Sequence, residues 1–244
     1  MTPLLFLSGF YVGWNIGAND TANCVGTSVG SGLLSYRGAI YLVAVFVTLG
    51  ALLQGQNVAT TIGKGVVKAE LPRLAVLVAM LAAGSFVTLA TVLKLPVSTS
   101  QSIVGAVAGI GLAVGAPVDF GKLIRIVQIW VLNPFLAAVL AYVIYRVTAV
   151  PLRRARLVGL WDRLMALLVL ASAAYMAFSL GSNDVGNSVG PLVNLGYDMR
   201  LLVLMGGVAL AVGALTYGHR VTETIGGSIT VLDPLSAFSA QAAA

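Results

Sequence analysis

A segment of the form Gly-x-Asn-Asp-x-x-Asn-x-x-Gly occurs twice in this chain, each time within strongly apolar sequence. The first copy runs from Gly17 to Gly26, and the second, 164 positions later, runs from Gly181 to Gly190. A carboxylate and two amides at membrane depth are costly, and such groups are typical of functional sites. Two copies indicate an internal repeat, with a site where the two halves meet.

Composition places the chain among membrane proteins. Hydrophobic residues make up 59% of the sequence and charged residues 9%, whereas a soluble domain carries about 25% charged residues. The apolar runs are long and lack the alternation of a membrane-spanning strand, which excludes an outer-membrane barrel. We therefore predict an all-α integral membrane protein that forms a multi-span helical bundle.

Hydropathy divides the chain into stretches of about 20 residues, the length that a helix needs to cross a bilayer. The first stretch is too long for one straight crossing and carries the polar motif in its middle, so we expect a broken helix. A later polar turn precedes an apolar arm of about 21 Å, which is too short to span and predicts a re-entrant hairpin that lines a cavity. The predicted first repeat, residues 1–146, contains the broken helix over 4–34, spans over 38–53, 74–93 and 123–145, and the hairpin over 94–118.

Further matches extend the repeat. Gly50–Gly55 resembles Gly213–Gly218, and Val58–Gly63 resembles Val221–Gly226, each pair 163 positions apart. In this register the hairpin turn should recur near position 259, beyond the 244 residues of the chain. We therefore expect residues 164–244 to be an incomplete second repeat that lacks its hairpin, and the chain to be a fragment.

Basic residues gather between the two repeats, in a chain whose formal net charge is +6. This concentration predicts a cytoplasmic loop over residues 147–163, as the positive-inside rule describes. The alternative is a patch that binds anionic lipid or nucleic acid. The arginines concerned are Arg146, Arg153, Arg154, Arg156 and Arg163.

Several chemistries have no support in the sequence. No Gly-x-x-x-x-Gly-Lys-Ser/Thr loop is present, which argues against an ATP-driven pump. One cysteine and one histidine argue against a zinc or haem site. No nucleophile, base and acid can be combined into a catalytic set, so we predict a protein that is not an enzyme and uses no cofactor.

The Asn-Asp motifs suit a hard cation, because carboxylate and amide oxygens are the ligands such ions prefer. Asp20 can neutralise Na⁺, or can itself carry a proton if burial favours its neutral form. The alternative is that Asn19, Asp20 and Asn23 form a polar clasp between helices. Thr61 and Thr224 can add hydroxyl ligands, although plain helix termination explains them equally well. The second copy supplies Asn183, Asp184 and Asn187.

The polar turn has the chemistry of an anion site. Pro96 is followed by Ser98, Thr99, Ser100 and Gln101, directly before an apolar helix. Such residues suit a helix start, where free N–H groups and the positive end of the helix dipole attract an anion. Neutral donors without Lys or Arg suit an anion that must be released again. The alternative is simple capping of the helix.

These motifs together resemble the signatures of the inorganic phosphate transporter family. The resemblance rests on Gly17–Asn23 with Gly26–Gly32, on Pro96–Gln101, on Gly181–Asn187, and on Arg220–Gly226 with Leu232–Pro234. It implies a symporter that moves phosphate with Na⁺ or H⁺ and is built from inverted repeats. It also implies a homodimer in the plasma membrane with the N-terminus outside, the 147–163 loop in the cytoplasm, and no nucleic-acid partner.

The resemblance also assigns roles to residues. The phosphate ligands that it implies are Ser98, Thr99, Ser100, Gln101, Asn23 and Asn187. The cation ligands are Asn19, Asp20, Asn183 and Asp184, to which Thr61 and Thr224 are added. Because neutral donors do not tell tetrahedral anions apart, a carrier of another oxyanion such as sulfate is one alternative. A truncated, non-transporting subunit is a second, and a channel is a weaker third.

Overall fold

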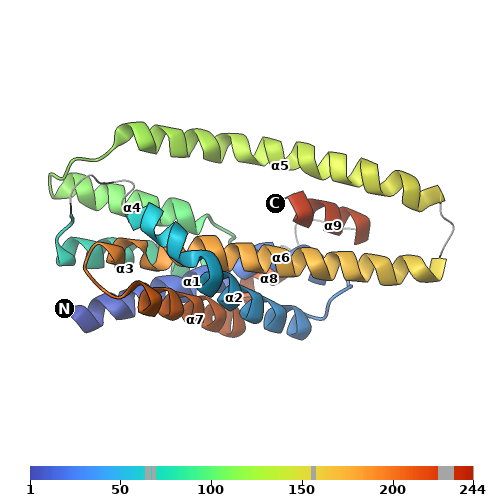
Figure 1. Cartoon of the computed structure of the whole chain (residues 1–244), viewed down its shortest axis with the longest axis horizontal. Helices are drawn as coiled ribbons and strands as arrows, with labels where there is room; N and C mark the ends of the chain where they lie inside the picture. The colour runs from blue at the N-terminus through green and yellow to red at the C-terminus, as the bar shows by residue number, and fades with distance from the viewer. Residues whose placement is uncertain (64–66, 68–69, 155–157, 225–233, 244) are drawn as a thin grey trace.

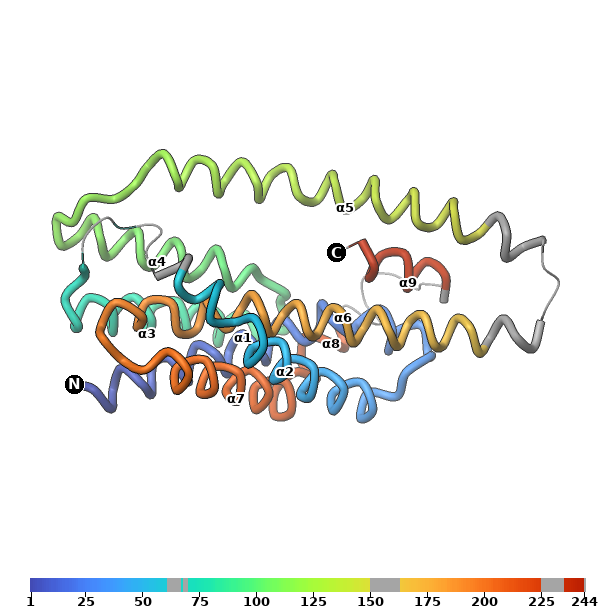
Figure 2. The backbone as a smooth tube through the Cα atoms, in the orientation of Figure 1, coloured from blue at the N-terminus to red at the C-terminus, as the bar shows by residue number. Residues whose placement is uncertain are grey.

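Long apolar helices dominate the computed structural model, which describes residues 1–63, 67, 70–154, 158–224 and 234–243. Five of these helices are long and apolar enough to cross a membrane, as an integral, multi-pass membrane protein requires. Figures 1 and 2 show their arrangement. The helices are α1 (Thr2–Gly30), α2 (Tyr36–Gly63), α3 (Arg73–Val92), α4 (Thr99–Ala113), α5 (Phe120–Arg154), α6 (Val158–Val193), α7 (Met199–Tyr217), α8 (His219–Glu223) and α9 (Pro234–Ala243).

The predicted break in the first helix is absent, and this part of the prediction is wrong. Helix α1 is continuous from Thr2 to Gly30, and α6 is likewise continuous across the second Asn-Asp motif. The motif side chains of α1 find partners on neighbouring elements, so the backbone keeps its own helical hydrogen bonds. The hydroxyl of Thr21 adds a 2.6 Å bond to the carbonyl of Gly17 without interrupting the helix.

The helices between the two repeats are longer than the apolar runs suggest. Helix α5 continues to Arg154, and α6 begins at Val158. Most of the predicted 147–163 loop is therefore helical. Hydropathy marks the part of a helix that lipid can surround, whereas Arg, Leu and Ala also favour helix in water. The ends of α5 and α6 thus extend past the stretch that hydropathy detects.

Helices α3 and α4 form the hairpin. They lie side by side, joined by residues 93–98, and the residues flanking their other ends meet in a bridge between Val67 and Val118. Helix α3 covers the predicted span 74–93 and is long and apolar enough to cross a membrane, and it also packs against α4 across the turn. The turn lies beside the middle of α1, where Asn19 bonds its backbone.

Two helix crossings follow the internal repeat. A Cβ atom on Gly17 would overlap the Leu210 carbonyl, and one on Gly213 would overlap the Trp14 carbonyl, so α1 and α7 approach backbone to backbone. In the same register, Gly181 and Gly50 bring α6 and α2 equally close. Small residues permit such contacts between membrane helices. Helix α6 also runs opposite to α1 in Figure 1.

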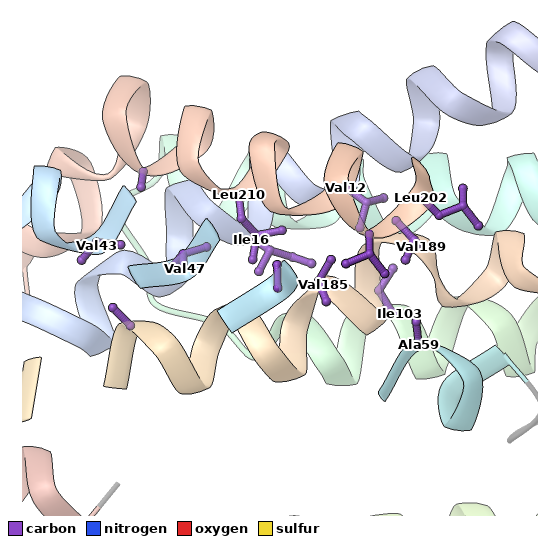
Figure 3. Close-up of a cluster of buried hydrophobic side chains, with 14 of the residues drawn as sticks. Val12, Ile16, Val43, Val47, Ala59, Ile103, Val185, Val189, Leu202 and Leu210 are labelled. Carbon is purple, nitrogen blue, oxygen red and sulfur yellow. The ribbon is translucent and has the colours of Figure 1, made fainter. Parts of the chain in front are cut away.

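The apolar core fills the space between these crossings. Side chains from α1, α2, α6 and α7 meet there, joined by Ile103 of the hairpin (Figure 3). Val185 and Val189, which are fully buried, lie within the second Asn-Asp motif, on either side of Asn187. The helix that carries this motif is therefore held by packing on both sides of the polar residues.

Helix α9 connects α5 to the bundle. It lies between α5 and α6 (Figure 2), and its Leu235 and Phe238 pack with Ala149 and Met165. On the side facing the bundle, the Gln241 carbonyl oxygen accepts hydrogen bonds from Ser28, at 2.7 Å, and Ser172, at 3.2 Å. The Gln241 amide donates to the Cys24 carbonyl. This buried amide fixes α9 against α1 and α6.

Substitution of Gly17 by alanine should destabilise the protein by about 1–3 kcal/mol or more, because the added methyl group meets backbone that no rotamer change can move. Thermal unfolding of the detergent-solubilised chain measures the effect. The matched control is Gly105→Ala in α4, where a Cβ atom meets nothing within 4 Å. Equal melting temperatures for the two variants would contradict the backbone-to-backbone crossing.

Candidate functional site

A pocket of about 670 Å³ lies where α1, α6 and the hairpin turn meet, with the end of α9 at its rim. It brings together the two Asn-Asp motifs, which are 164 positions apart in the sequence. The polar residues that line it are Asp20, Asn23, Ser98, Thr99, Ser100, Tyr175, Ser179, Asn183 and Asp184.

Asp20 provides the first carboxylate of the pocket and is only 5% exposed. The hydroxyl of Thr99 donates to Asp20 Oδ2 at 2.7 Å. The amide of Asn23 donates to Asp20 Oδ1 at 3.5 Å from three positions further along α1. Each carboxylate oxygen thus has a partner, one from its own helix and one from the hairpin.

Asp184 provides the second carboxylate in the same local arrangement. The amide of Asn187, three positions further along α6, donates to Asp184 Oδ1 at 2.7 Å. The same amide donates to Ser100 Oγ at 2.8 Å. Adjacent residues of the hairpin tip, Thr99 and Ser100, therefore contact one motif each. The tip is tied to both repeats.

The tip begins helix α4 at the pocket wall. Ser98 is the N-cap, and its hydroxyl accepts a hydrogen bond from the Gln101 backbone N–H at 3.3 Å. Ser98 therefore caps the helix, which is the alternative that the sequence analysis gave for this turn. Because the first residues of α4 line the pocket, the positive end of the helix dipole lies there as well.

Asn19 holds the turn in place. Its amide nitrogen donates to Thr91 Oγ1 at 2.9 Å and to the Leu95 carbonyl at 3.1 Å. Its carbonyl oxygen accepts from the Val97 backbone N–H at 3.1 Å. Both amide hydrogens are therefore engaged, in a side chain that is 1% exposed. The polar-clasp alternative describes Asn19 well.

The counterpart of Asn19 is placed differently. Asn183 is exposed and lines the pocket, and its amide makes a 3.3 Å bond to Ser179 Oγ on its own helix. The two copies of the motif are thus alike at Asp20 and Asp184 but unlike at the preceding asparagine. Sequence alone cannot reveal this difference, because both copies read Asn-Asp.

Five predicted site residues do not line this pocket or lie outside the described side chains. Asn19 and Asn187 bond the hairpin instead of lining the pocket. Gln101 lines a separate groove of about 500 Å³ on another side of the turn, together with Phe86 and Ser102. Thr224 donates to the Lys94 carbonyl at 3.0 Å and does not line the pocket. The side chain of Thr61 lies outside the part that the structure describes.

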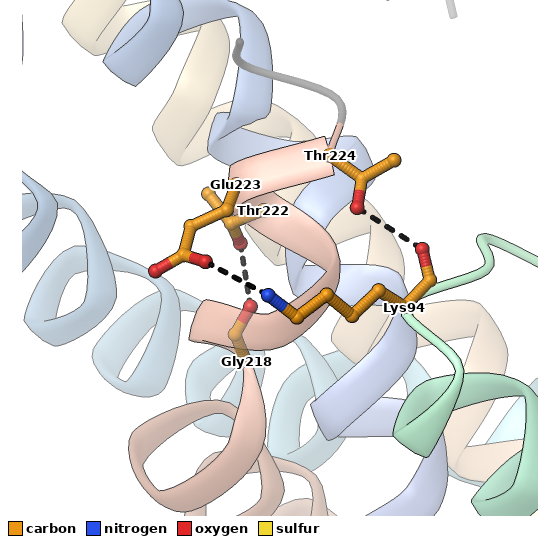
Figure 4. A network of polar contacts seen from close by, with 5 residues as sticks. All are labelled: Lys94, Gly218, Thr222, Glu223 and Thr224. Carbon is orange, nitrogen blue, oxygen red and sulfur yellow. Dashed lines mark hydrogen bonds and ion pairs between the residues drawn. The ribbon is translucent and has the colours of Figure 1, made fainter. Parts of the chain in front are cut away.

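A contact between the hairpin and α8 was not predicted. Lys94 Nζ lies 3.6 Å from Glu223 Oε2, next to the bond from Thr224 (Figure 4). Lys94 has a φ of 61°, a left-handed conformation that is uncommon for lysine. Because both charged side chains are more than half exposed, the ion pair contributes little to stability. No sequence pattern predicts that Lys94 and Glu223 lie close together.

The charges of the pocket are unbalanced. Asp20 and Asp184 line it, whereas no Lys, Arg or His is among its described lining residues. Hydroxyl and amide groups and the start of α4 supply the donors. Such a pocket can accept a cation directly, and it can accept an anion only if positive charge arrives with it.

Comparison with known proteins places these features in context. The pattern of the phosphate transporter family matches residues 16–160 and 153–244. A Chlamydia pneumoniae protein provisionally named a phosphate permease is 30% identical, and the match covers 98% of this chain and 82% of that protein. Inorganic phosphate transporter 2-1 of Arabidopsis thaliana is 27% identical over 98% of this chain and 60% of its own length. A solved structure titled "The sodium-dependent phosphate transporter" matches with a TM-score of 0.86 and 24% identity, over 100% of this chain and 82% of the other.

The unequal roles of the two asparagines can be tested by stability. Asn19→Ala should cost about 2 kcal/mol or more, because it leaves the Val97 N–H and the Leu95 carbonyl without their partner. Asn183→Ala removes one exposed hydrogen bond and should change stability by less than about 0.5 kcal/mol. Thermal unfolding in detergent compares them. Equal losses in both variants would contradict the clasp.

Proposed function

Because this chain belongs to the phosphate transporter family, whose members are transporters and not enzymes, we propose that it carries inorganic phosphate together with a cation through the pocket between the two Asn-Asp motifs. The fold agrees with that of a solved transporter structure. The finer assignments below, of site residues and coupling ion, are inferences from the geometry of the pocket.

The charge of the pocket is the observation that carries the proposal. Two carboxylates, Asp20 and Asp184, line a space in which no described side chain is basic. Unit charges 4 Å apart near a protein surface interact by about 4 kcal/mol, so phosphate beside ionised carboxylates is strongly disfavoured. A cation bound together with phosphate offsets the repulsion between phosphate and the two carboxylates. Coupling then follows from electrostatics, because each ion improves the site for the other.

Phosphate is best accommodated at the hairpin tip. Ser98, Thr99 and Ser100 line the pocket at the start of α4, where hydroxyls and the helix N-terminus favour an anion. The amide of Asn23 lines the pocket beside Asp20 and can turn its donors to the anion, whereas Asn187 would act through Ser100, to which its amide donates. We leave Gln101 out of this set because it lines another groove.

The cation is best accommodated at Asp20 and Asp184, with Asn183 as an available amide oxygen on the same wall. Asn19 is assigned a positioning role, because its amide already holds the turn. We propose Na⁺ rather than H⁺ as the coupling ion. Two considerations support Na⁺: carboxylate and amide oxygens are suitable ligands, and the similar solved structure is titled a sodium-dependent phosphate transporter.

Phosphate is a better substrate for this pocket than sulfate. At neutral pH phosphate carries one or two protons, and a carboxylate such as Asp184 can accept a hydrogen bond from its O–H group. Sulfate has no proton to donate and would oppose the carboxylates with oxygen lone pairs only. A site built to accept such a hydrogen bond rejects an analogue that lacks the donor.

The predicted topology also remains part of the proposal. Exposed Arg146 on α5 and the arginines that follow it in the sequence support a cytoplasmic position for the region between the repeats. The N-terminus would then lie outside. Rocking of one repeat against the other about the glycine crossings would open the pocket alternately to the two sides. The homodimer and the plasma-membrane location stay predictions.

Uptake of radiolabelled phosphate into proteoliposomes tests the proposal. An inward Na⁺ gradient should drive uptake, excess sulfate should not compete, and replacement of Na⁺ by choline should abolish uptake. The double variant Asp20→Asn/Asp184→Asn should take up phosphate at least tenfold more slowly, because it removes the negative charge that binds the cation.

The matched control is Asp198→Asn, which removes the same charge at the exposed N-cap of α7. Asparagine caps a helix as well as aspartate does, so this variant should keep its uptake. Uptake that is independent of Na⁺, or that survives in the double variant, would overturn the cation assignment.

A further inference from the structure

A hydrogen-bond network joins α1 to α3 more than one helical turn before the hairpin turn. The hydroxyl of Thr88 donates to Asn15 Oδ1 at 2.7 Å and lies 2.5 Å from the hydroxyl of Tyr11. The Asn15 amide nitrogen donates to the Tyr11 carbonyl at 2.9 Å. Asn15 is 1% exposed, and none of the three residues lines the 670 Å³ pocket.

The directions of these bonds follow from the number of hydrogens. Thr88 has one hydroxyl hydrogen, which it shares between Asn15 Oδ1 and the Gly84 carbonyl, 2.9 Å away on its own helix. Tyr11 is therefore the donor to Thr88. Gly84 leaves room for the Tyr11 ring, which a Cβ atom at this position would overlap. Removal of the Thr88 hydroxyl would leave both Asn15 Oδ1 and the Tyr11 hydroxyl without their partner.

A second set of bonds lies one helical turn closer to the hairpin turn. Asn19 lies four positions after Asn15 and donates to Thr91 Oγ1 at 2.9 Å. Thr91 in turn lies three positions after Thr88. Residues with these spacings share one face of a helix. Two successive rungs of hydrogen bonds, Asn15–Thr88 and Asn19–Thr91, therefore hold α3 against α1 in one register.

The rest of the buried surface of α3 fixes this register only weakly. Apart from Thr91, the buried residues of the helix are Ala75, Val76, Ala79, Met80, Ala83, Gly84, Val87 and Ala90. Dispersion contacts between such residues are individually small and have no direction, whereas a hydrogen bond weakens steeply when its geometry changes. A single buried polar residue fixes the register of paired helices in coiled coils for the same reason.

The register of α3 determines where the hairpin tip lies. Only residues 93–98 separate α3 from α4, so the position of Thr88 along α1 sets the position of the tip. A shift by one residue moves a helix by about 1.5 Å. This is enough to break the 2.7 Å bond from Thr99 to Asp20 and, with it, the contact of the tip with α6.

We propose that Thr88 and Asn15 are positioning residues for phosphate, which hold the hairpin at the depth where residues 98–100 meet the anion. This inference rests on the proposed function and adds that contacts outside the pocket set the phosphate affinity. The cation affinity does not depend on them. Asp20 and Asp184 lie on α1 and α6, whose glycine crossings with α7 and α2 do not involve the network.

Equilibrium binding of phosphate at saturating Na⁺ tests this role. Thr88→Val keeps the shape of the side chain without its hydroxyl and should weaken phosphate binding by about fivefold or more. Thr88→Ser keeps the hydroxyl and should bind phosphate as the unaltered chain does. Na⁺ binding without phosphate should be the same in all three. The matched control is Thr148→Val on α5, whose hydroxyl bonds the Ile144 carbonyl of its own helix, and its phosphate affinity should not change.

A further variant separates positioning from stability. Tyr11→Phe/Asn15→Leu/Thr88→Val replaces all three polar side chains by apolar ones, so no partner is left unpaired and the chain should fold. It should still bind phosphate about fivefold more weakly, or worse, because an apolar interface no longer specifies the register. Unchanged phosphate affinity in this variant, or equal losses in Thr88→Ser and Thr88→Val, would overturn the proposal.

A distance measurement reports the register without phosphate. In a Cys24→Ala background, nitroxide labels at Leu95→Cys in the turn and Leu53→Cys on α2, both more than half exposed, should give one narrow distance distribution. The triple variant should shift or broaden it by about 1.5 Å or more, and an unchanged distribution would overturn the proposal. A changed distribution in a chain whose unaltered form binds no phosphate would overturn the proposed function, and with it the link to phosphate, but not the fixed register.

Discussion

Close backbone contact between two pairs of helices is the constraint on which the rest of the structure depends. Gly17 and Gly213 bring α1 onto α7, and Gly181 and Gly50 bring α6 onto α2. Gly17 and Gly181 also open the two Asn-Asp motifs, so each crossing fixes the helix just before its carboxylate. The glycines therefore determine where Asp20 and Asp184 lie, and both line one pocket. An unbroken helix can carry these groups because their partners are side chains of the same helix or of the hairpin, and not the helix backbone.

The two Asn-Asp motifs are related by the repeat, but the hairpin contacts them differently and makes the site asymmetric. Thr99 bonds Asp20 and Ser100 bonds Asn187, so one helix start contacts both repeats. The amide of Asn19 is engaged in hydrogen bonds to the turn, whereas its counterpart Asn183 remains exposed to the pocket. The same motif position thus holds a positioning residue, Asn19, in the first half and a pocket-lining amide, Asn183, in the second.

Much of this was predictable from the sequence, and the failures have physical causes. The duplicated motif marked Asp20, Asn23, Asn183 and Asp184, which line the pocket, because polar groups in apolar helices are costly enough to stand out. The continuity of α1 was not predictable, because it depends on partners such as Thr91 and Thr99 that are distant in sequence. Gln101 lines a groove separate from the pocket, because successive residues of a helix start point in different directions. Tyr175 and Ser179 gave no signal, since isolated aromatic and hydroxyl residues are common in membrane helices.

The central claim is that phosphate and a cation share one pocket and stabilise each other there. Equilibrium binding of phosphate to the purified chain, titrated at increasing Na⁺ with choline replacing it at constant ionic strength, tests this claim most directly. The account predicts that phosphate affinity rises at least tenfold from zero to saturating Na⁺, and that phosphate raises Na⁺ affinity by the same factor. A phosphate affinity that does not change with Na⁺ would contradict it.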